Sequence, residues 1–537
     1  MFRFLSAESK TVASAAAIVG VLSFVSRIFG LVRDRILAGA FGAGDVLDAY
    51  YAAFKVPDLL FNLLVVGAVS ASFIPLFTRH VSAGEKEKAW RLANNLLHVV
   101  LAAMAAVALA IFFFADAVGS AVAPGFAGAK HELVVQFTRL MLLAQILLAG
   151  SSIFGSILQG SKRFFLASLA PIFYNLGIIA GALFLVPAAG PMGLAWGVVL
   201  GAAAHAFVQW FGSRLIGYRY AWRFNPFDAE SREIIKSMAP RTLSLAVSQI
   251  QFLIFTMMAS YFSAGSVTVF QFAYNIQFFA VGIVGVSYAI AVFPSFAGAL
   301  GAGDARRFVS VFSQTVREVL FLMVPMMMLM LVLRVQAVRL VVGAGMFGWS
   351  ETFQTMDILA WFLISLAAQG LVYVLARAFF AMRDTVTPLI SGILSAVVGV
   401  VSAWFFSQWF GVKGLAMAFS LASFLNLATL WIPLRLRIGS LDEARIVRSL
   451  VSISVAGLCA AVVAQVLKPI TVQIISLETF WGVFLQATSA GGIGLLAYGL
   501  VAFLFKSEEL HSLMSGIRRK FFKQYRPKEA LSATEEA

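Results

Sequence analysis

The sequence has one cysteine, Cys459, and few charged residues. A single thiol excludes an intramolecular disulfide and any metal or cluster site that needs several cysteines. Asp, Glu, Lys and Arg supply only 12% of the 537 residues, whereas hydrophobic residues supply 61%. Soluble domains contain about 25% charged residues. The composition therefore excludes a soluble enzyme and predicts a polytopic membrane protein.

Motifs of nucleotide, metal and acyl-transfer chemistry are absent as well. The chain contains no G-x-x-x-x-G-K-[ST] phosphate loop, no H-E-x-x-H metal spacing and no G-x-S-x-G elbow. We therefore expect no catalytic residue, no metal and no cofactor. Transport, and not chemistry on a substrate, is the predicted class of activity.

Apolar segments long enough to cross a bilayer recur along the whole chain. A span takes roughly 20 mostly apolar residues, and about 14 segments qualify, which predicts an all-α protein. Ser9 to Leu22 resembles a signal-peptide core, but Arg27 and Arg33 follow without a convincing cleavage site and more spans come after, so we expect a retained first helix. The predicted helices cover approximately 11–38, 47–78, 89–115, 132–160, 164–186, 190–213, 238–262, 267–298, 308–333, 356–381, 386–408, 412–434, 447–467 and 480–505.

Basic residues are distributed unevenly between the predicted loops. With the N-terminus in the cytoplasm, the cytoplasmic segments hold 28 of the 40 Lys and Arg residues, and the external loops hold five. This asymmetry fits an even number of spans with both termini cytoplasmic. It also explains the net charge of +15 without a nucleic-acid partner. We expect the basic tail at 507–537 to lie on the anionic inner leaflet; a protein-binding tail is the alternative.

Four landmarks of the first half recur in the second half, in the same order and at one nearly constant interval. The pairs are Ala43-Gly44 with Ala264-Gly265, Phe73–Phe77 with Phe293–Phe296, Lys162-Arg163 with Arg383, and Gly193–Ala195 with Gly414–Ala416. The interval spans six helices, so both copies have the same orientation, and parallel repeats of this kind are typical of transporters. We predict an N-lobe at 1–225, a C-lobe at 226–440, two further helices at 441–506 and the cytoplasmic tail.

The segment from Ser26 to Phe77 concentrates charge inside two predicted spans. A charge near the bilayer centre costs roughly 2.5–3.5 kcal/mol on insertion scales, so such residues usually face a bundle interior or water. The segment therefore predicts a polar, hydrated cavity. The charged residues within these two spans are Arg27, Arg33, Asp34, Arg35, Asp48, Lys55 and Asp58.

Helical spacing assigns candidate roles to these residues. Residues seven apart share a face, which groups Arg27 with Asp34, and Asp48 with Lys55 and Asn62. Arg27, Arg33 and Lys55 suit an anionic substrate group, because a guanidinium donates two parallel hydrogen bonds to a phosphate. Asp34 and Asp48 would balance charge or act in gating. The alternative is a set of structural ion pairs.

Four further polar residues lie in other predicted spans. Arg377, in the second lobe, could face the same cavity and is a further candidate for substrate binding. Arg317 and Glu318 are adjacent, so they point in different directions and favour separate structural partners. His205 is interpreted as a packed polar residue, because a lone histidine is weak evidence for proton coupling.

Long motifs resemble one known family. Ser26 to Leu60 reads SRIFGLVRDRILAGAFGAGDVLDAYYAAFKVPDLL, Ala123 to Phe126 reads APGF, and AFFAMRDTVTP follows the tenth predicted helix. These motifs resemble the MurJ/MviN family of lipid II flippases in the MOP exporter superfamily. The resemblance covers nearly the whole chain; its first motif is specific, whereas APGF alone is not.

The resemblance implies a fold of six, six and two helices and a defined substrate. Family members move the undecaprenyl-pyrophosphate-linked peptidoglycan precursor, lipid II, from the inner to the outer leaflet of the bacterial cytoplasmic membrane by alternating access. It also implies that Arg27, Arg33 and Asp48 line the central cavity, and that the helices at 441–506 form a groove for the lipid tail.

Two stretches depart from the family pattern. After KVPDLL many members carry two arginines and then a glutamate, at the positions of Phe61, Asn62 and Val66 here. In the eighth helix, Asn275 occupies the position of a family arginine. Asn62 and Asn275 can still donate hydrogen bonds, so both remain candidates for substrate binding, although they bring no charge.

We therefore expect a monomeric lipid II flippase whose partners are lipid II and anionic membrane lipids. The alternatives are a flippase for another polyprenyl-linked oligosaccharide, a different MOP-type exporter, and a non-transporting scaffold of cell-wall assembly. A drug exporter would more naturally carry acidic, cation-binding positions without the arginines of the first helix. The coupling ion stays open.

Overall fold

The structure is a computed structural model that describes the backbone of residues 12–66, 73–472 and 479–522. These residues form helices and no β-strand, which confirms the predicted all-α class. Contacts divide the chain into two compact units. Unit 1 comprises Met1–Phe279, Ala337–Ser365 and Arg383–Trp431, and unit 2 comprises Ala280–Gln336, Leu366–Met382 and Ile432–Ala537.

Unit 1 contains the helices of the N-terminal half and several of the second half. They are α2 (Val12–Phe41), α3 (Asp45–Phe61), the π-helix η1 (Asn62–Val66), α4 (Ile74–Ser82), α5 (Lys86–Phe113), α6 (Ala115–Val122), α7 (Gly128–Gly160), α8 (Phe164–Ala180), the π-helix η3 (Gly181–Leu185), α9 (Val186–Ala189), α10 (Met192–Leu215), α11 (Ala229–Ala259), most of α12 (Ser266–Val281), α16 (Trp349–Ile364), α18 (Val386–Phe410) and most of α19 (Val412–Ile438).

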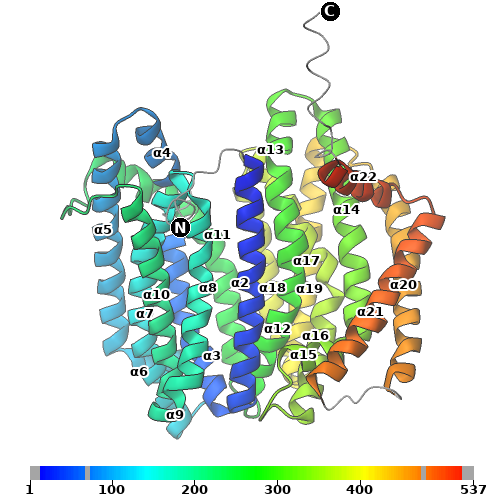
Figure 1. Ribbon diagram of the computed structural model, residues 1–537, viewed down its shortest axis with the longest axis horizontal. Coiled ribbons are helices and arrows are strands. Elements are labelled where there is room, and N and C mark those ends of the chain that lie inside the picture. Colours follow the sequence, from blue (N-terminus) through cyan, green and yellow to red (C-terminus); the bar gives the residue numbers. More distant parts are fainter. Residues whose placement is uncertain (1–11, 67–72, 473–478, 523–537) are drawn as a thin grey trace, which may run out of the picture. The chain divides into compact units, whose positions relative to one another are not determined.

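Close helix packing in unit 1 depends on small residues. Helix α10 lies against both α7 and α8, as Figure 1 shows. A Cβ atom added at Gly177 of α8 would lie 2.2 Å from the Cα of Gly201 in α10, so the two backbones approach too closely for any side chain. Such contacts between small residues are the usual way in which membrane helices associate.

Unit 2 is built around α14. It contains the π-helix η4 (Gly282–Val286), α13 (Ser287–Gly301), α14 (Ala305–Val332), α17 (Leu366–Ala381), α20 (Glu443–Val472), α21 (Phe480–Leu504) and α22 (Glu508–Phe522), while α15 (Arg334–Val341) crosses the division between the units. Helix α14 packs against α13, α17 and α20, and α20 packs against α21. Figure 1 shows α22, drawn in red, lying crosswise near one end of α14.

The sequence repeat is visible in the order and details of the elements. The short helices α6 and α15 begin at Ala115 and Arg334, and the π-helices η1 and η4 begin at Asn62 and Gly282, so both pairs keep the interval of the sequence repeat. Unusual backbone angles repeat as well: the matching residues Lys162 and Arg383 have φ of 59° and 60°. The same backbone design therefore occurs twice. The lobe boundaries stay a prediction, because the compact units combine helices of both halves.

The described residues contain ten helices long and apolar enough to cross a membrane, or up to eleven if the pair α16 and α17, bent by 46°, counts as one span. The expected count of about 14 is therefore not confirmed. The expected spans at 11–38, 47–78 and 238–262 are not among them. All three include positions whose backbone or side chains lie outside the description.

Helices also occur in segments expected as loops. Helix α11 begins at Ala229, where the Asp228 carboxylate accepts a hydrogen bond from the Ser231 N–H, and α22 occupies part of the expected tail. Residues 523–537, which include the last basic residues of the predicted tail, lie outside the described residues, as do the side chains of 516–522.

Candidate functional site

A polar network in unit 1 begins with two neighbouring residues of α2. Asp34 is almost fully buried, and its Oδ1 accepts hydrogen bonds from Nε and Nη2 of Arg33 at 3.0 and 2.8 Å. The Nη1 of Arg33 donates to Oδ1 of Asn175 in α8 at 3.2 Å. The Arg33 side chain keeps 22% of its surface exposed. A partly open arginine is thus oriented by one buried carboxylate and one amide.

The network continues from Asp34 to Lys55 through two amides of α12. Asn275 donates to Asp34 Oδ2 at 2.8 Å, and its own Oδ1 accepts from Gln271 Nε2 at 2.8 Å. The Oε1 of Gln271 accepts from Lys55 Nζ of α3 at 2.9 Å. A continuous hydrogen-bonded path therefore joins the cations of α2 and α3 through α12.

Asp58 supplies a second acid close to Lys55. It lies one turn further along α3, and its Oδ1 accepts from Gln145 of α7 at 3.1 Å. Asn62 donates back to the carbonyl oxygen of Asp58 at 2.8 Å. One donor of the Asn62 amide is therefore engaged by the backbone one turn earlier, where η1 begins. The role of Asn62 in substrate binding stays a prediction.

Arg27 and Arg377 lie in different surroundings. The Arg27 Cζ is 5.6 Å from the ring centroid of Phe278, so it approaches α12 close to Asn275 in sequence. Arg377 belongs to unit 2, where its Cζ lies 5.9 and 5.8 Å from the rings of Phe293 and Phe380. Arg33, Lys55 and Asn275 are thus joined in one network within unit 1.

Asp48 belongs to a separate cluster near the start of α3. Its side chain is 1% exposed, and its oxygens accept from Lys130 Nζ at 2.7 Å and from the Gly265 N–H at 2.7 Å. They also accept from the N–H and hydroxyl of Thr268 at 2.9 and 2.7 Å. Asp48 and Lys55, predicted to share one face of a helix, therefore bind different partners and belong to two different sites. Asp48 fastens the start of α3 to the start of α12.

The APGF motif supports the Asp48 cluster. A Cβ atom at Gly125 would lie 2.2 Å from the Ser260 carbonyl oxygen, and the Gly125 N–H donates to the Ser260 hydroxyl. The ring of Phe126 lies 3.9 Å from Lys130 Nζ. Only glycine permits this approach to the end of α11, and the following phenylalanine faces the lysine that binds Asp48.

Several partners were not predicted from sequence. Gln271, Gln145 and Asn175 are ordinary amides, and Lys130 falls between the helices predicted at 89–115 and 132–160. Their partners lie 82 to 216 positions away, a distance over which sequence spacing gives no register. The repeat was the one available signal. It aligns Ala43-Gly44 with Ala264-Gly265, and in the structure Ala43 contacts Gly265.

Comparisons with known proteins give a consistent result. The family model described as "Lipid II flippase MurJ" matches residues 37–485. A "Probable lipid II flippase MurJ" of Rhizobium tropici is 28% identical over 522 residues, which cover 94% of this chain and 96% of that protein.

Solved structures share the fold. "Lipid II flippase MurJ, inward closed conformation" superposes with a TM-score of 0.76 at 22% identity and covers 91% of this chain and 98% of that chain. A multidrug resistance MATE family transporter of the MOP superfamily, in an inward-facing conformation, gives 0.68 at 17% identity and covers 78% and 96%. From the family match, the chain belongs to the lipid II flippase MurJ family.

Proposed function

We propose that this protein is a lipid II flippase of the bacterial cytoplasmic membrane and not an enzyme. It moves the undecaprenyl-pyrophosphate-linked precursor from the inner to the outer leaflet by alternating access. Family membership supports the substrate, and the hydrogen-bonded path from Arg33 to Lys55 carries the argument for a specific anion-binding position in this chain.

The chemistry of that path suits a pyrophosphate. Arg33 presents a planar guanidinium whose donors can be transferred from a carboxylate to a phosphate of similar geometry. Lys55 has three donors, of which Gln271 takes one at 2.9 Å. In the empty state Asp34 holds the arginine in place and balances its charge. A bound pyrophosphate would therefore accept hydrogen bonds from Arg33 and Lys55 in place of Asp34 and Gln271, and the two donors would need little reorientation.

Asn275 lowers the positive charge of the site relative to family members with arginine there, but it keeps hydrogen bonds to both neighbours. The amide donates to Asp34 and accepts from Gln271, so it fills a position where family members carry an arginine. With Asn62 also neutral, Arg27, Arg33 and Lys55 would supply the positive charge. Because of this departure, Lys55 should contribute more to pyrophosphate binding than it does in relatives that carry the arginines.

The Asp48 cluster is proposed as the fastening that opens during transport. It joins helices that belong to different predicted lobes, α3 and α12, through three hydrogen bonds from Gly265 and Thr268 to one buried carboxylate. The same carboxylate also accepts from Lys130 of α7. Alternating access requires such a contact to break in one state and to re-form in another. Asp48 would thus act in gating and not in substrate binding.

We also propose a monomer with both termini in the cytoplasm and with the basic tail on anionic lipids. The asymmetry of basic loops supports this orientation. A reporter that works only in the cytoplasm should be active when fused after Ala537 and silent when inserted near Pro124. The reverse pattern would overturn the orientation.

Flipping of lipid II in proteoliposomes tests the function. Arg33→Gln and Lys55→Gln should each reduce transport severely, because a charge-assisted hydrogen bond is worth roughly 1.5–3 kcal/mol, or about 10- to 150-fold in binding. Arg139→Gln is the matched control: Arg139 also lies in a spanning helix, but it is exposed against Phe112. It should transport normally.

Three results would contradict the proposal in different ways. No flipping by the wild-type protein, in liposomes where another lipid-linked oligosaccharide moves, would change the substrate. Normal lipid II transport by both the Arg33 and Lys55 variants would show that this network does not bind the pyrophosphate. Equal loss in the Arg139 control would indicate a general effect of removing charge.

A further inference from the structure

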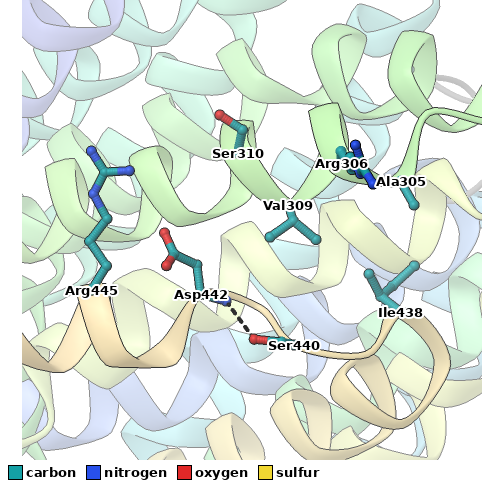
Figure 2. A pocket seen from close by; sticks show the side chains of 8 residues that line it. All are labelled: Ala305, Arg306, Val309, Ser310, Ile438, Ser440, Asp442 and Arg445. Carbon is teal, nitrogen blue, oxygen red and sulfur yellow. Dashed lines mark hydrogen bonds between the residues drawn. The ribbon is translucent and has the colours of Figure 1, made fainter.

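A second polar site lies in unit 2 and includes none of the residues proposed for transport. It is a pocket of about 470 Å³ between the start of α14 and the segment that connects α19 to α20. Figure 2 shows Arg306 and Arg445 at opposite ends of this pocket, with Ser310 and Asp442 between them. None of these residues is used by the proposed flipping mechanism.

Arg306 supplies an uncompensated positive charge. Among the residues that the structure describes, no hydrogen bond or ion pair engages its side chain. The one carboxylate in the pocket, Asp442, already accepts from the Ser313 hydroxyl at 2.8 Å. The hydroxyl groups of Ser310 and Ser440 line the same space. A free guanidinium with nearby hydroxyl groups is the donor set of a phosphate site.

Arg445 is the second guanidinium, and it is shared with α22. Its Nη2 lies 2.5 Å from Glu508 Oε2, and the same Glu508 oxygen accepts from Arg317 at 2.9 Å. Both side chains of the Arg445–Glu508 pair are more than half exposed, at 52% and 59%. An exposed ion pair is worth only ~0–1 kcal/mol, so a competing anion can exchange with Glu508.

The surroundings favour a lipid over a soluble anion. Val309 and Ile438 form apolar parts of the pocket wall. Ile432 and Leu436, one turn apart on the last part of α19, are 58% and 80% exposed. Both belong to a helix long and apolar enough to cross a membrane, and Ile438 at the end of the same helix lines the pocket. A ligand with a phosphate and a hydrocarbon part matches both features.

We propose that this pocket binds the phosphate of an anionic phospholipid head group, with Arg306 as the primary contact. Arg445 joins the contact when it leaves Glu508, so lipid binding weakens one of the links between α20 and α22. Basic pockets between helices at the cytoplasmic side are typical of such head-group sites. The site is independent of lipid II transport.

Protection of an introduced cysteine tests the site on the full-length protein. Cys459→Ser removes the one native thiol, and Ala305→Cys places a reporter in the pocket wall; Ser440→Cys is the second reporter if the first misfolds. Phosphatidylglycerol in mixed micelles should slow maleimide labelling, whereas phosphatidylcholine should not. Arg306→Gln should raise the phosphatidylglycerol concentration needed by about tenfold, the factor for one lost charge-assisted hydrogen bond.

Two variants sharpen the test. Arg307→Gln makes the same change at the next residue, outside the pocket, and should leave protection unchanged. Glu508→Gln frees Arg445 and should lower the lipid concentration required. Equal protection by both lipids, equal effects of the Arg306 and Arg307 variants, or equal protection by inorganic phosphate alone would each overturn the proposal, the last by assigning the site to a soluble anion.

Discussion

Asp48→Asn should weaken the contact between α3 and α12. The amide keeps one carbonyl oxygen, which can accept from Lys130 and Gly265, but its NH₂ group then faces the Thr268 N–H. A charge-assisted hydrogen bond is worth ~1.5–3 kcal/mol and a buried donor without a partner costs ~1–3 kcal/mol, so the variant loses roughly 2.5–6 kcal/mol. Since about 1.4 kcal/mol is tenfold, even the lower value changes the open fraction more than about 50-fold.

Cysteine labelling can measure this opening. In a Cys459→Ser background, Ala43→Cys places a thiol where the backbone of residue 43 contacts Gly265. A membrane-impermeant maleimide should label it much faster when Asp48 is replaced. The matched control is Asp45→Asn, because Asp45 also pairs with Lys130, at 2.8 Å, but is 59% exposed. An exposed pair contributes ~0–1 kcal/mol, so labelling should change little.

The refuting result is specific. If Asp48→Asn folds, as judged by its melting temperature and elution volume, and labels no faster than Asp45→Asn, the buried carboxylate does not hold these helices together. The gating role of Asp48 would then be wrong. If the variant fails to fold, Thr268→Val gives a milder test, since it removes one hydroxyl donor and leaves the backbone N–H in place.

Adding Asn275→Arg to the Lys55→Gln variant should partly restore lipid II binding, because the new guanidinium lies beside the buried Asp34 carboxylate. Native mass spectrometry can measure the binding, and no gain in affinity would show that the anion does not contact α12. Hydrogen bonds from Arg445 hold the pKa of Glu508 below its ordinary value of 4.5. Its share of the docking energy of α22 is thus present above pH 4.5 and lost as pH falls through the lowered pKa, so a spin label on α22 should become more mobile in acid and not in alkali. Gly201→Ala should lower the melting temperature, because the added Cβ would lie 2.4 Å from a carbonyl oxygen of α8 and overpacking costs ~1–3 kcal/mol.

The sequence alone determined the class of protein and the location of its charge. Sixty-one per cent hydrophobic residues leave no alternative to membrane helices, and the cost of burying charge makes Arg33 and Lys55 stand out without any coordinates. The repeat was also readable, because short motifs such as Ala43-Gly44 and Ala264-Gly265 recur in the same order in both halves. The structure agrees at the level of η1 and η4.

The number of spans was less well determined. The count covers only the described residues, and the expected spans at 11–38, 47–78 and 238–262 each include positions whose backbone or side chains lie outside the description. Short helices such as α6 and α15 escaped notice because eight residues are too few for a periodic pattern.

Only the tertiary structure decided which charges act together. Spacing placed Asp48 and Lys55 on one face, yet each binds partners on α12 that lie more than 200 positions away. Helical periodicity fixes the direction of a side chain around its own axis and carries no information about the neighbouring helix. The pairing of Arg33 with Asn175, and of Lys55 with Gln271, depends on how helices pack. That packing is set by contacts such as Gly177 against Gly201.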